Sequence, residues 1–187
     1  IKAFREYEKY KKEKIDKYSK KCQLGNKGKE GITYLVVDKK GNEYAMKTFR
    51  KQKSSSKLRK EAELQKLASD VGISPNIIDI DTVSKYIVME KMDKHLYSII
   101  KKNNGILSTN HQRQIIKIYK KLDQIGVFHG DCNLLNYMMK DNKIYIIDFG
   151  MSKEITTTLV KKLGTDRPNI NIMTLGFILK LKELKCS

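Results

Sequence analysis

The pattern of hydrophobic and polar positions differs between the first and second halves of this chain. Residues 22–90 contain short apolar runs broken by glycine and polar turns, which predicts strands, and Gly41-Asn42 marks a hairpin turn among them. Beyond residue 93 the apolar residues recur at helical spacing. We therefore expect an α+β protein in which a strand-rich part precedes a helical part.

The helical part is predicted to contain three main helices. A short helix covers residues 94–102, and a longer one starts after the cap residue Ser108, runs to about Gln124 and ends at Gly126. The longer helix has one apolar stripe that we expect to be buried: Ile115, Ile118, Tyr119 and Leu122. The last helix covers roughly residues 169–184, and its expected inward residues are Ile172, Leu175, Ile178 and Leu179, with Met173 as a further candidate.

Two segments near the start of the chain are strongly basic. Residues 1–21 carry nine basic and four acidic side chains, with apolar residues at loosely helical spacing, which predicts a helical extension. Residues 51–60 combine serines with basic side chains. We expect this second segment to be a mobile loop ahead of a helix that contains Glu61.

Two motifs in fixed order carry the candidate chemistry. HGDCNLLN occupies residues 129–136 and DFG residues 148–150, so Asp148 follows Asp131 by 17 positions. Between them, residues 137–139 and 143–147 are predicted strands around a polar turn, which would set Asn136 and Asp148 at neighbouring loop ends. Phosphoryl transfer from ATP needs a carboxylate that orients the attacking hydroxyl, and an amide oxygen and a second carboxylate that hold Mg²⁺. Asp131, Asn136 and Asp148 supply these groups.

With these motifs the chain resembles the protein-kinase superfamily, and the resemblance extends over residues 24–150 in the correct order. YAMK at residues 44–47 resembles the end of the third strand of that fold, which implies that Lys47 binds the α- and β-phosphates of ATP. LRKEAEL at residues 58–64 resembles the helix that carries the carboxylate partner of this lysine. Glu61 is preferred as the partner and Glu63 is the alternative, because a helix turns about 100° per residue and only one of them can face Lys47 squarely.

The resemblance also implies an adenine site and a phosphate-covering loop. YIVMEKM at residues 86–92 resembles the fifth strand and the hinge, with Met89 as gatekeeper and the main chain of Glu90 and Met92 bonding to adenine. Residues 24–31 have the pattern GxxGxxG in place of the family's GxGxxG. Glycines allow the backbone to approach phosphates closely, and the candidates in this loop are Gly25, Gly28 and Gly31.

Several departures from the common pattern narrow the resemblance. The catalytic loop has HGD in place of HRD, and Asn133 replaces a lysine. Because an arginine beside the catalytic aspartate normally receives an activation-loop phosphate, Gly130 argues against that mode of switching. No Ala-Pro-Glu segment follows Gly150, and the 37 residues after it are too few for the late C-lobe helices. Residues 171–176 resemble the start of the central C-lobe helix, with Asn171 where an aspartate is usual.

This compact pattern is most similar to small atypical Ser/Thr kinases, such as the kinase subunit of the KEOPS tRNA-modification complex. It is also similar to the minimal kinases of large DNA viruses. The low proline count, the absence of tryptophan and the abundance of Lys, Ile and Asn indicate an AT-rich genome. The chain starts at Ile1 and not at an initiator methionine, so we expect that it begins inside a longer protein.

Charge and cysteine content add to this interpretation. Thirty-nine Lys and Arg against 21 Asp and Glu leave a net charge of +18. The preferred interpretation is a surface of solvated lysines, and the alternative is incidental association with nucleic acid or acidic proteins beside a protein substrate. No apolar stretch approaches 18 residues, so no membrane span is expected. The scattered cysteines Cys22, Cys132 and Cys186 favour a reducing intracellular compartment, cytoplasm or nucleus, or a virion if the source is viral. Cys132 is expected to pack as a small hydrophobe.

The sequence thus predicts an α+β, bilobal kinase-like fold: a basic helical extension at residues 1–21, an N-lobe with hinge at 22–92, and a minimal helical C-lobe at 93–187. The expected activity is phosphorylation of Ser/Thr hydroxyls of a protein with ATP and Mg²⁺. Two alternatives stay open. One is a non-catalytic kinase-fold subunit for scaffolding or nucleic-acid association, and the other is a small-molecule phosphotransferase, which would usually need further C-terminal helices around its acceptor.

Overall fold

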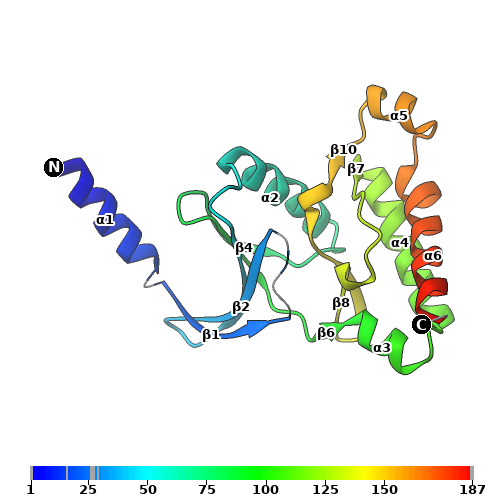
Figure 1. Ribbon diagram of the computed structural model, residues 1–187, viewed down its shortest axis with the longest axis horizontal. Helices are drawn as coiled ribbons and strands as arrows, with labels where there is room; N and C mark the ends of the chain where they lie inside the picture. Colours follow the sequence, from blue (N-terminus) through cyan, green and yellow to red (C-terminus); the bar gives the residue numbers. More distant parts are fainter. Residues whose placement is uncertain (1, 16, 26–27, 29, 186–187) are drawn as a thin grey trace. The chain divides into compact units, whose positions relative to one another are not determined.

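The computed structural model describes residues 2–15, 17–25, 28 and 30–185 (Figure 1). The chain divides into two compact units. Unit 1 comprises Ile1–Arg59 and Ile77–Lys91, and unit 2 comprises Lys60–Asn76 and Met92–Ser187. Unit 1 is rich in strands and unit 2 is mainly helical, so the predicted α+β class with two lobes is confirmed.

Unit 1 is built on a five-stranded antiparallel sheet with the order β1-β2-β3-β5-β4. Its elements are α1 (Lys2–Ile15), β1 (Tyr18–Leu24), β2 (Gly31–Asp38), β3 (Glu43–Phe49), β4 (Ile77–Asp81) and β5 (Tyr86–Glu90). The predicted N-terminal helix is present, and β1 begins inside the segment assigned to it. One face of the sheet carries an apolar cluster of Tyr18, Val36, Met46, Tyr86 and Val88.

The turn between β2 and β3 confirms the hairpin predicted at Gly41-Asn42. The carboxylate of Asp38 accepts hydrogen bonds from the backbone N–H groups of Lys40 and Asn42, at 2.8 and 2.9 Å. The N–H of Asn42 would otherwise be left without a protein partner in so tight a turn. This hairpin sets the register of β2 against β3 and thereby the position of Lys47 on the sheet.

Helix α2 (Ser55–Asp70) begins in unit 1 and continues into unit 2. The prediction of a mobile loop over residues 51–60 is wrong for its second half, because the helix starts at Ser55. Ser54 caps this start: its hydroxyl accepts from the N–H of Lys57 at 3.3 Å, and its carbonyl accepts from the N–H of Leu58. A serine within a basic run is therefore a helix start here and not a loop marker.

Unit 2 contains the remaining elements. These are β6 (Lys94–His95), α3 (Leu96–Lys102), α4 (Thr109–Gln124), β7 (Val127–Phe128), η1 (Leu134–Asn136), β8 (Tyr137–Lys140), β9 (Lys143–Ile146), η2 (Phe149–Met151), β10 (Lys153–Glu154), α5 (Thr157–Leu163), η3 (Asn169–Met173) and α6 (Thr174–Lys185). Two small sheets, with the orders β6-β8-β9 and β10-β7, join the loops to the helices. No helix of the described residues is long and apolar enough to cross a membrane.

Helix α4 agrees with its prediction in both ends and in its buried face. The hydroxyl of Ser108 accepts from the N–H of His111 at 3.2 Å, and Gly126 follows the helix in a left-handed conformation. The predicted stripe is buried in the main core of unit 2: Ile115, Ile118, Tyr119 and Leu122. The short helix predicted at residues 94–102 starts two residues later, at Leu96, because Lys94 and His95 pair with β8.

The inward face predicted for the last helix is wrong at Leu175, Ile178 and Leu179, and only Met173 of the predicted residues is fully buried. Leu175, Ile178 and Leu179 are exposed by 59%, 44% and 50%, whereas Met173 and Phe177 are buried. The segment begins as a π-helical turn, η3, and only then continues as α6. A π-turn holds more residues than an α-turn, so the residues after it are rotated relative to a continuous α-helix. Periodicity counted through this turn therefore selected the wrong side.

Candidate functional site

A β-hairpin of unit 2 holds the two predicted metal-binding residues next to each other. Asn136 ends η1 immediately before β8, and Asp148 follows Ile147 at the end of β9. The strands pair in the register Tyr137↔Ile146, and the N–H of Ile147 donates to the carbonyl of Asn136 at 2.9 Å. The two predicted strands and their polar turn are thus present, and they bring the ends of both motifs together.

The loop that carries Asp131 is ordered by hydrogen bonds of its own side chains. The carboxylate of Asp131 accepts from the N–H of Asn133 at 3.0 Å, and the side chain of Asn133 accepts from the N–H of Leu135. Asn133 is thereby the N-cap of η1. The asparagine that replaces the family's usual lysine has a structural function in this chain, because it starts the turn that leads to Asn136.

His129 links this loop to the strand that ends at Asp148. Its Nε2–H donates to the carbonyl of Ile147 at 3.1 Å, and its ring packs edge to face on Phe149 with centroids 5.0 Å apart. The side chain is fully buried, and Nδ1 has no hydrogen-bond partner. Burial lowers the pKa of His129 because the charged imidazolium would lose its hydration. His129 is therefore a neutral, positioning group between Asp131 and Asp148.

A buried asparagine that the sequence interpretation missed anchors the same loop. The side-chain oxygen of Asn169, in η3, accepts from the N–H of His129 at 3.0 Å, and its Nδ2 donates to the carbonyl of Val127 at 2.7 Å. Nδ2 also donates to the carboxylate of Asp123 at 2.7 Å. Asn171, assigned to the aspartate position of the family, instead donates to Thr165 and is exposed. Asn171 and Asn169 are only two positions apart in the sequence, but the π-turn determines which of the two side chains faces the loop.

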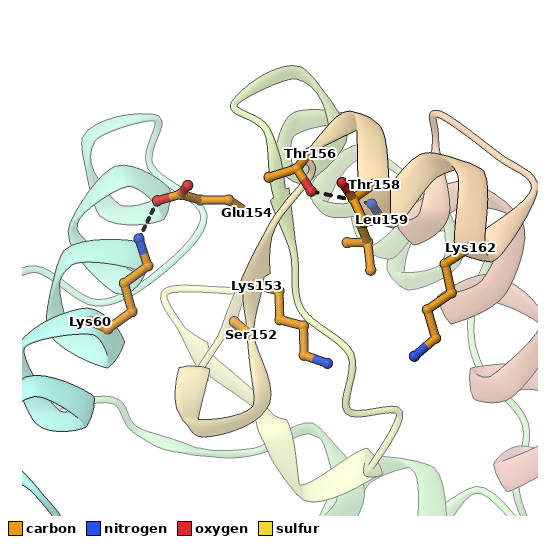
Figure 2. A pocket seen from close by; sticks show the side chains of 8 residues that line it. All are labelled: Lys60, Ser152, Lys153, Glu154, Thr156, Thr158, Leu159 and Lys162. Carbon is orange, nitrogen blue, oxygen red and sulfur yellow. Dashed lines mark hydrogen bonds and ion pairs between the residues drawn. The ribbon is translucent and has the colours of Figure 1, made fainter.

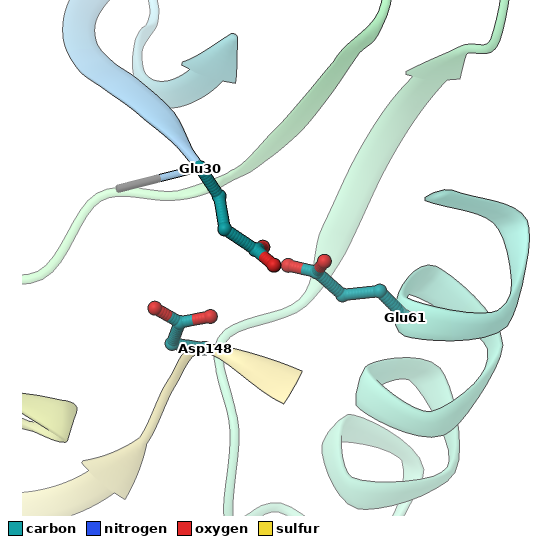
Figure 3. Close-up of side chains that lie close together, drawn as sticks. All are labelled: Glu30, Glu61 and Asp148. Atoms are coloured by element: carbon teal, nitrogen blue, oxygen red, sulfur yellow. The ribbon is translucent and has the colours of Figure 1, made fainter. Parts of the chain in front are cut away.

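Asp148 has an unusual backbone and an acidic neighbour. Its φ of +66° lies in the left-handed region, which costs a non-glycine residue about 1 kcal/mol. The preceding residue, Ile147, is held by two hydrogen bonds: its N–H donates to the carbonyl of Asn136, and its carbonyl accepts from His129. Figure 3 shows Asp148 after β9 and Glu61 projecting from α2, and carboxylate oxygens of the two lie within 4.8 Å of each other. Glu61 is 3% exposed, whereas Glu63 is exposed. Glu30, also drawn, belongs to unit 1, where it accepts from Lys53 at 2.6 Å.

The remaining predicted residues of the nucleotide site lie mostly in unit 1. Lys47 is on β3 between Thr33 of β2 and Ile87 of β5, and its Nζ lies 5.0 Å from the centroid of the Phe49 ring. On β5, Met89 is buried opposite Ala45, and Glu90 is opposite Tyr44. Met92 follows in unit 2 and is also buried.

The glycine loop is described in part, since residues 26, 27 and 29 lie outside the described residues. Gly25 has a φ of +69°, and the N–H of Gly28 donates to the carbonyl of Gly31 at 2.9 Å. A Cβ on Gly31 would overlap the carbonyl oxygen of Thr48. Close pairing of β2 with β3 is therefore a sufficient reason for glycine at residue 31.

Cys132, next to Asp131, packs in the way predicted from the sequence. It is half-buried, its Sγ lies 3.4 Å from the sulfur of Met173, and a Cβ on Gly176 would overlap it. Burial raises the pKa of the Cys132 thiol, which opposes formation of a nucleophilic thiolate. Cys22 is a free, exposed thiol, and Cys186 lies outside the described residues.

Comparison with known proteins gives consistent matches. The model of the protein kinase domain matches residues 18–167. The KEOPS complex subunit Bud32 of Pyrococcus abyssi is 29% identical over 114 residues, which are 57% of this chain and 52% of that protein. A probable serine/threonine-protein kinase BUD32 homolog of Archaeoglobus fulgidus is 27% identical over 148 residues, 78% of this chain and 71% of that protein.

A third relative is much longer than this chain. It is a probable bifunctional tRNA threonylcarbamoyladenosine biosynthesis protein of Methanosphaera stadtmanae, 35% identical over 129 residues, which are 64% of this chain and 23% of that protein. The chain therefore spans about half of the Bud32 relative and about a quarter of the bifunctional one.

Proposed function

The chain belongs to the protein kinase family, and we propose that it transfers the γ-phosphoryl group of ATP to Ser or Thr hydroxyls of a protein. The observation that carries this proposal is the hydrogen-bonded arrangement of Asp131, Asn136 and Asp148 in unit 2. His129 connects the loop of the first aspartate to Ile147, and Ile147 connects to Asn136. A fold that had lost catalysis would have no reason to keep all three side-chain types on this framework.

The residues present fit a divalent cation and ATP. Asn136 is 6% exposed and its Nδ2 has no hydrogen-bond partner, which is unusual for a buried amide outside a ligand site. Amide and carboxylate oxygens are the ligands that Mg²⁺ prefers. We therefore assign Asn136 and Asp148 to Mg²⁺, which when bound would neutralise charge on the phosphates.

The chain's own residues then have distinct functions. The carboxylate of Asp131 orients the acceptor hydroxyl and accepts its proton during transfer. Lys47 binds the α- and β-phosphates, and Glu61 positions its ammonium group. Neutral His129 and Asn169 hold the loop so that the carboxylate of Asp131 keeps its direction, and such positioning supplies most of the catalysis in phosphoryl transfer.

We propose that further residues surround the nucleotide. We assign Gly25, Gly28 and Gly31 to the loop that covers the phosphates. Met89 would close the back of the adenine site, and the main chain of Glu90 and Met92 would bond to the base.

The proposal is tested by incubating the protein with radiolabelled ATP, Mg²⁺ and generic basic and acidic protein acceptors. Asp148→Asn should abolish transfer and Asp131→Asn should slow it by about 10³-fold or more, because positioning and charge neutralisation are both lost. Asp166→Asn is the matched control, since Asp166 is highly exposed in unit 2. Wild-type rates in Asp148→Asn would rule out the assignment.

A non-catalytic scaffold is the second candidate, and one relative supports it. The Bud32 relative is named as a subunit of the KEOPS complex, and subunits of a complex can contribute a surface without turnover. The two candidates differ in one measurement: a scaffold would bind ATP-Mg²⁺ weakly or not at all and would show no transfer that depends on Asp131.

A further inference from the structure

A cavity of 430 Å³ in unit 2 lies beside the segment that follows the DFG motif. Its charged wall residues are Lys60 of α2, Lys153 and Glu154 of β10, and Lys162 of α5. Hydroxyl groups line it as well, those of Ser152, Thr156 and Thr158. Cations and hydroxyl donors around one cavity are the chemistry that recognises an anion.

The charges of this cavity do not cancel. Lys60 forms an ion pair with Glu154, the single acidic residue of the wall. Lys153 and Lys162 have no ion-pair partner among the described residues, and Figure 2 shows the ammonium group of Lys153 pointing away from Glu154 and that of Lys162 pointing toward the side of Lys153. The cavity therefore has an excess of two positive charges on one side.

Hydrogen bonds connect this wall to the catalytic loop. β10 pairs with β7 in the register Lys153↔Phe128, and the hydroxyl of Ser152 donates to the carbonyl of His129 at 3.1 Å. Asp131 follows Phe128 by three positions. A side chain bound in the cavity would thus be held by the same small sheet that leads into the loop of the catalytic aspartate.

Two of the hydroxyl groups that line the cavity already form hydrogen bonds elsewhere in the chain. The Oγ1 of Thr156 accepts from the N–H of Leu159 at 3.2 Å and caps α5. The hydroxyl of Ser152 is bonded to His129. Both groups are already used to hold the backbone, which leaves the ammonium groups of Lys153 and Lys162 for a ligand from outside.

We propose that this cavity is a specificity site for an anionic side chain of the acceptor protein, a phosphoserine, a phosphothreonine or a carboxylate. Lys153 and Lys162 bind the anion, and the hydroxyl of Thr158 donates to its oxygens. The proposal rests on the proposed phosphoryl transfer, whose substrate class it narrows from any Ser/Thr protein to an acidic or previously phosphorylated one.

The first test measures binding and needs no catalysis. Fluorescent peptides with Ala at the acceptor position carry phosphoserine, Glu or Ala at one flanking position, scanned along the peptide. They are titrated with phosphatase-treated full-length chain and followed by anisotropy. At one flanking position the anionic peptides should bind about tenfold or more tightly than the Ala peptide, as expected for charge-assisted hydrogen bonds. A preference for phosphoserine over Glu would identify a previously phosphorylated substrate.

The second test assigns this preference to residues. Lys153→Gln and Lys162→Gln should each reduce the ratio of anionic to neutral binding about fivefold to tenfold. Lys161→Gln is the matched control, because Lys161 is the neighbouring lysine on α5, is exposed and does not line the cavity. Equal losses in Lys161→Gln and Lys162→Gln would show only the general field of a basic protein and would overturn the site, as would equal binding of all peptides.

Transfer assays with Ser acceptors separate this inference from the proposed function. Transfer to all peptides at equal kcat/KM would overturn the specificity site and leave phosphoryl transfer standing. Anion-selective binding without any transfer would contradict the proposed function while the anion site itself remained.

Discussion

Single buried polar side chains hold the loop of residues 129–136 of unit 2 in place. His129 is neutral and donates to the β9 end, while Asn169 accepts from its backbone and donates to Val127 and Asp123. Each of these groups is within the core, where an unpaired polar atom costs about 1–3 kcal/mol. The loop is therefore sensitive to changes that alter one hydrogen-bonding atom and little else.

The first residue-scale prediction concerns Asn169 and Asp123. Asn169→Asp should keep the acceptor for His129 but place a carboxylate within hydrogen-bond distance of Asp123, so we expect a loss of about 2–4 kcal/mol in the free energy of unfolding. Adding Asp123→Asn should recover part of this loss, measured by urea denaturation and a double-mutant cycle. Asn171→Asp, at the position favoured by the sequence pattern, should change stability by less than about 0.5 kcal/mol.

A second prediction at this scale is a pH dependence. Burial lowers the folded-state pKa of His129 below the ordinary value of 6.5, so the unfolded chain binds a proton more tightly. The stabilising effect of neutral His129 is complete above pH 6.5 and declines as the pH falls below it, by up to about 1.4 kcal/mol per pH unit. The free energy of unfolding, measured by urea denaturation at pH 7.5, 6.5 and 5.5, should fall as the pH is lowered. A free energy of unfolding that rises from pH 7.5 to 5.5 would contradict the burial of an uncharged ring.

At the scale of elements, α6 is apolar on two sides. Phe177 of α6 and Met173 at the end of η3 face the core of unit 2, and a second row of Leu175, Ile178 and Leu179 on α6 is exposed. Hydrophobic content alone does not distinguish the two rows, because both have helical spacing. The difference comes from the π-turn in front of the helix and from the contact between Gly176 and Cys132.

Neighbouring substitutions on α6 test which row is buried. Phe177→Ala should lower the free energy of unfolding by about 3–5 kcal/mol, because it leaves a cavity against Tyr137, whose ring centroid is 5.1 Å away. Leu179→Ala should cost less than about 1 kcal/mol. Thermal or urea denaturation of both variants measures these losses. A larger loss of stability in Leu179→Ala than in Phe177→Ala would favour the face predicted from periodicity.

At the scale of the whole molecule, the net charge of +18 is the property that phosphoryl transfer does not require. Of the basic run before Glu61, Lys53 and Lys60 are paired with Glu30 and Glu154. Lys51 and Lys57 are exposed, and no ion pair of either is recorded among the described residues. They are therefore the better candidates for a general anion-binding surface.

If this charge binds nucleic acid, affinity for DNA or RNA should be independent of sequence and should fall steeply between about 50 and 200 mM salt. Lys51→Gln together with Lys57→Gln should reduce the slope of log K against log salt by up to about 0.9 per lysine, with ATP binding unchanged. Lys66→Gln is the control, since Lys66 is paired with Asp70 at 2.8 Å. No retention on nucleic acid at low salt would leave the lysines as a solvated surface.

The sequence by itself determined the class of the fold, the order of the two motifs, the β8–β9 hairpin and helix α4 with its cap and buried stripe. These features depend on local hydrogen bonds and on a periodicity that no irregular turn interrupts. Only the tertiary structure decided that α2 starts at Ser55, that Asn169 and not Asn171 holds the loop of residues 129–136, and that Phe177 and not Leu179 faces the core. A π-turn and contacts with Asp123 and Cys132, far away in sequence, select among side chains that are equivalent in the local pattern.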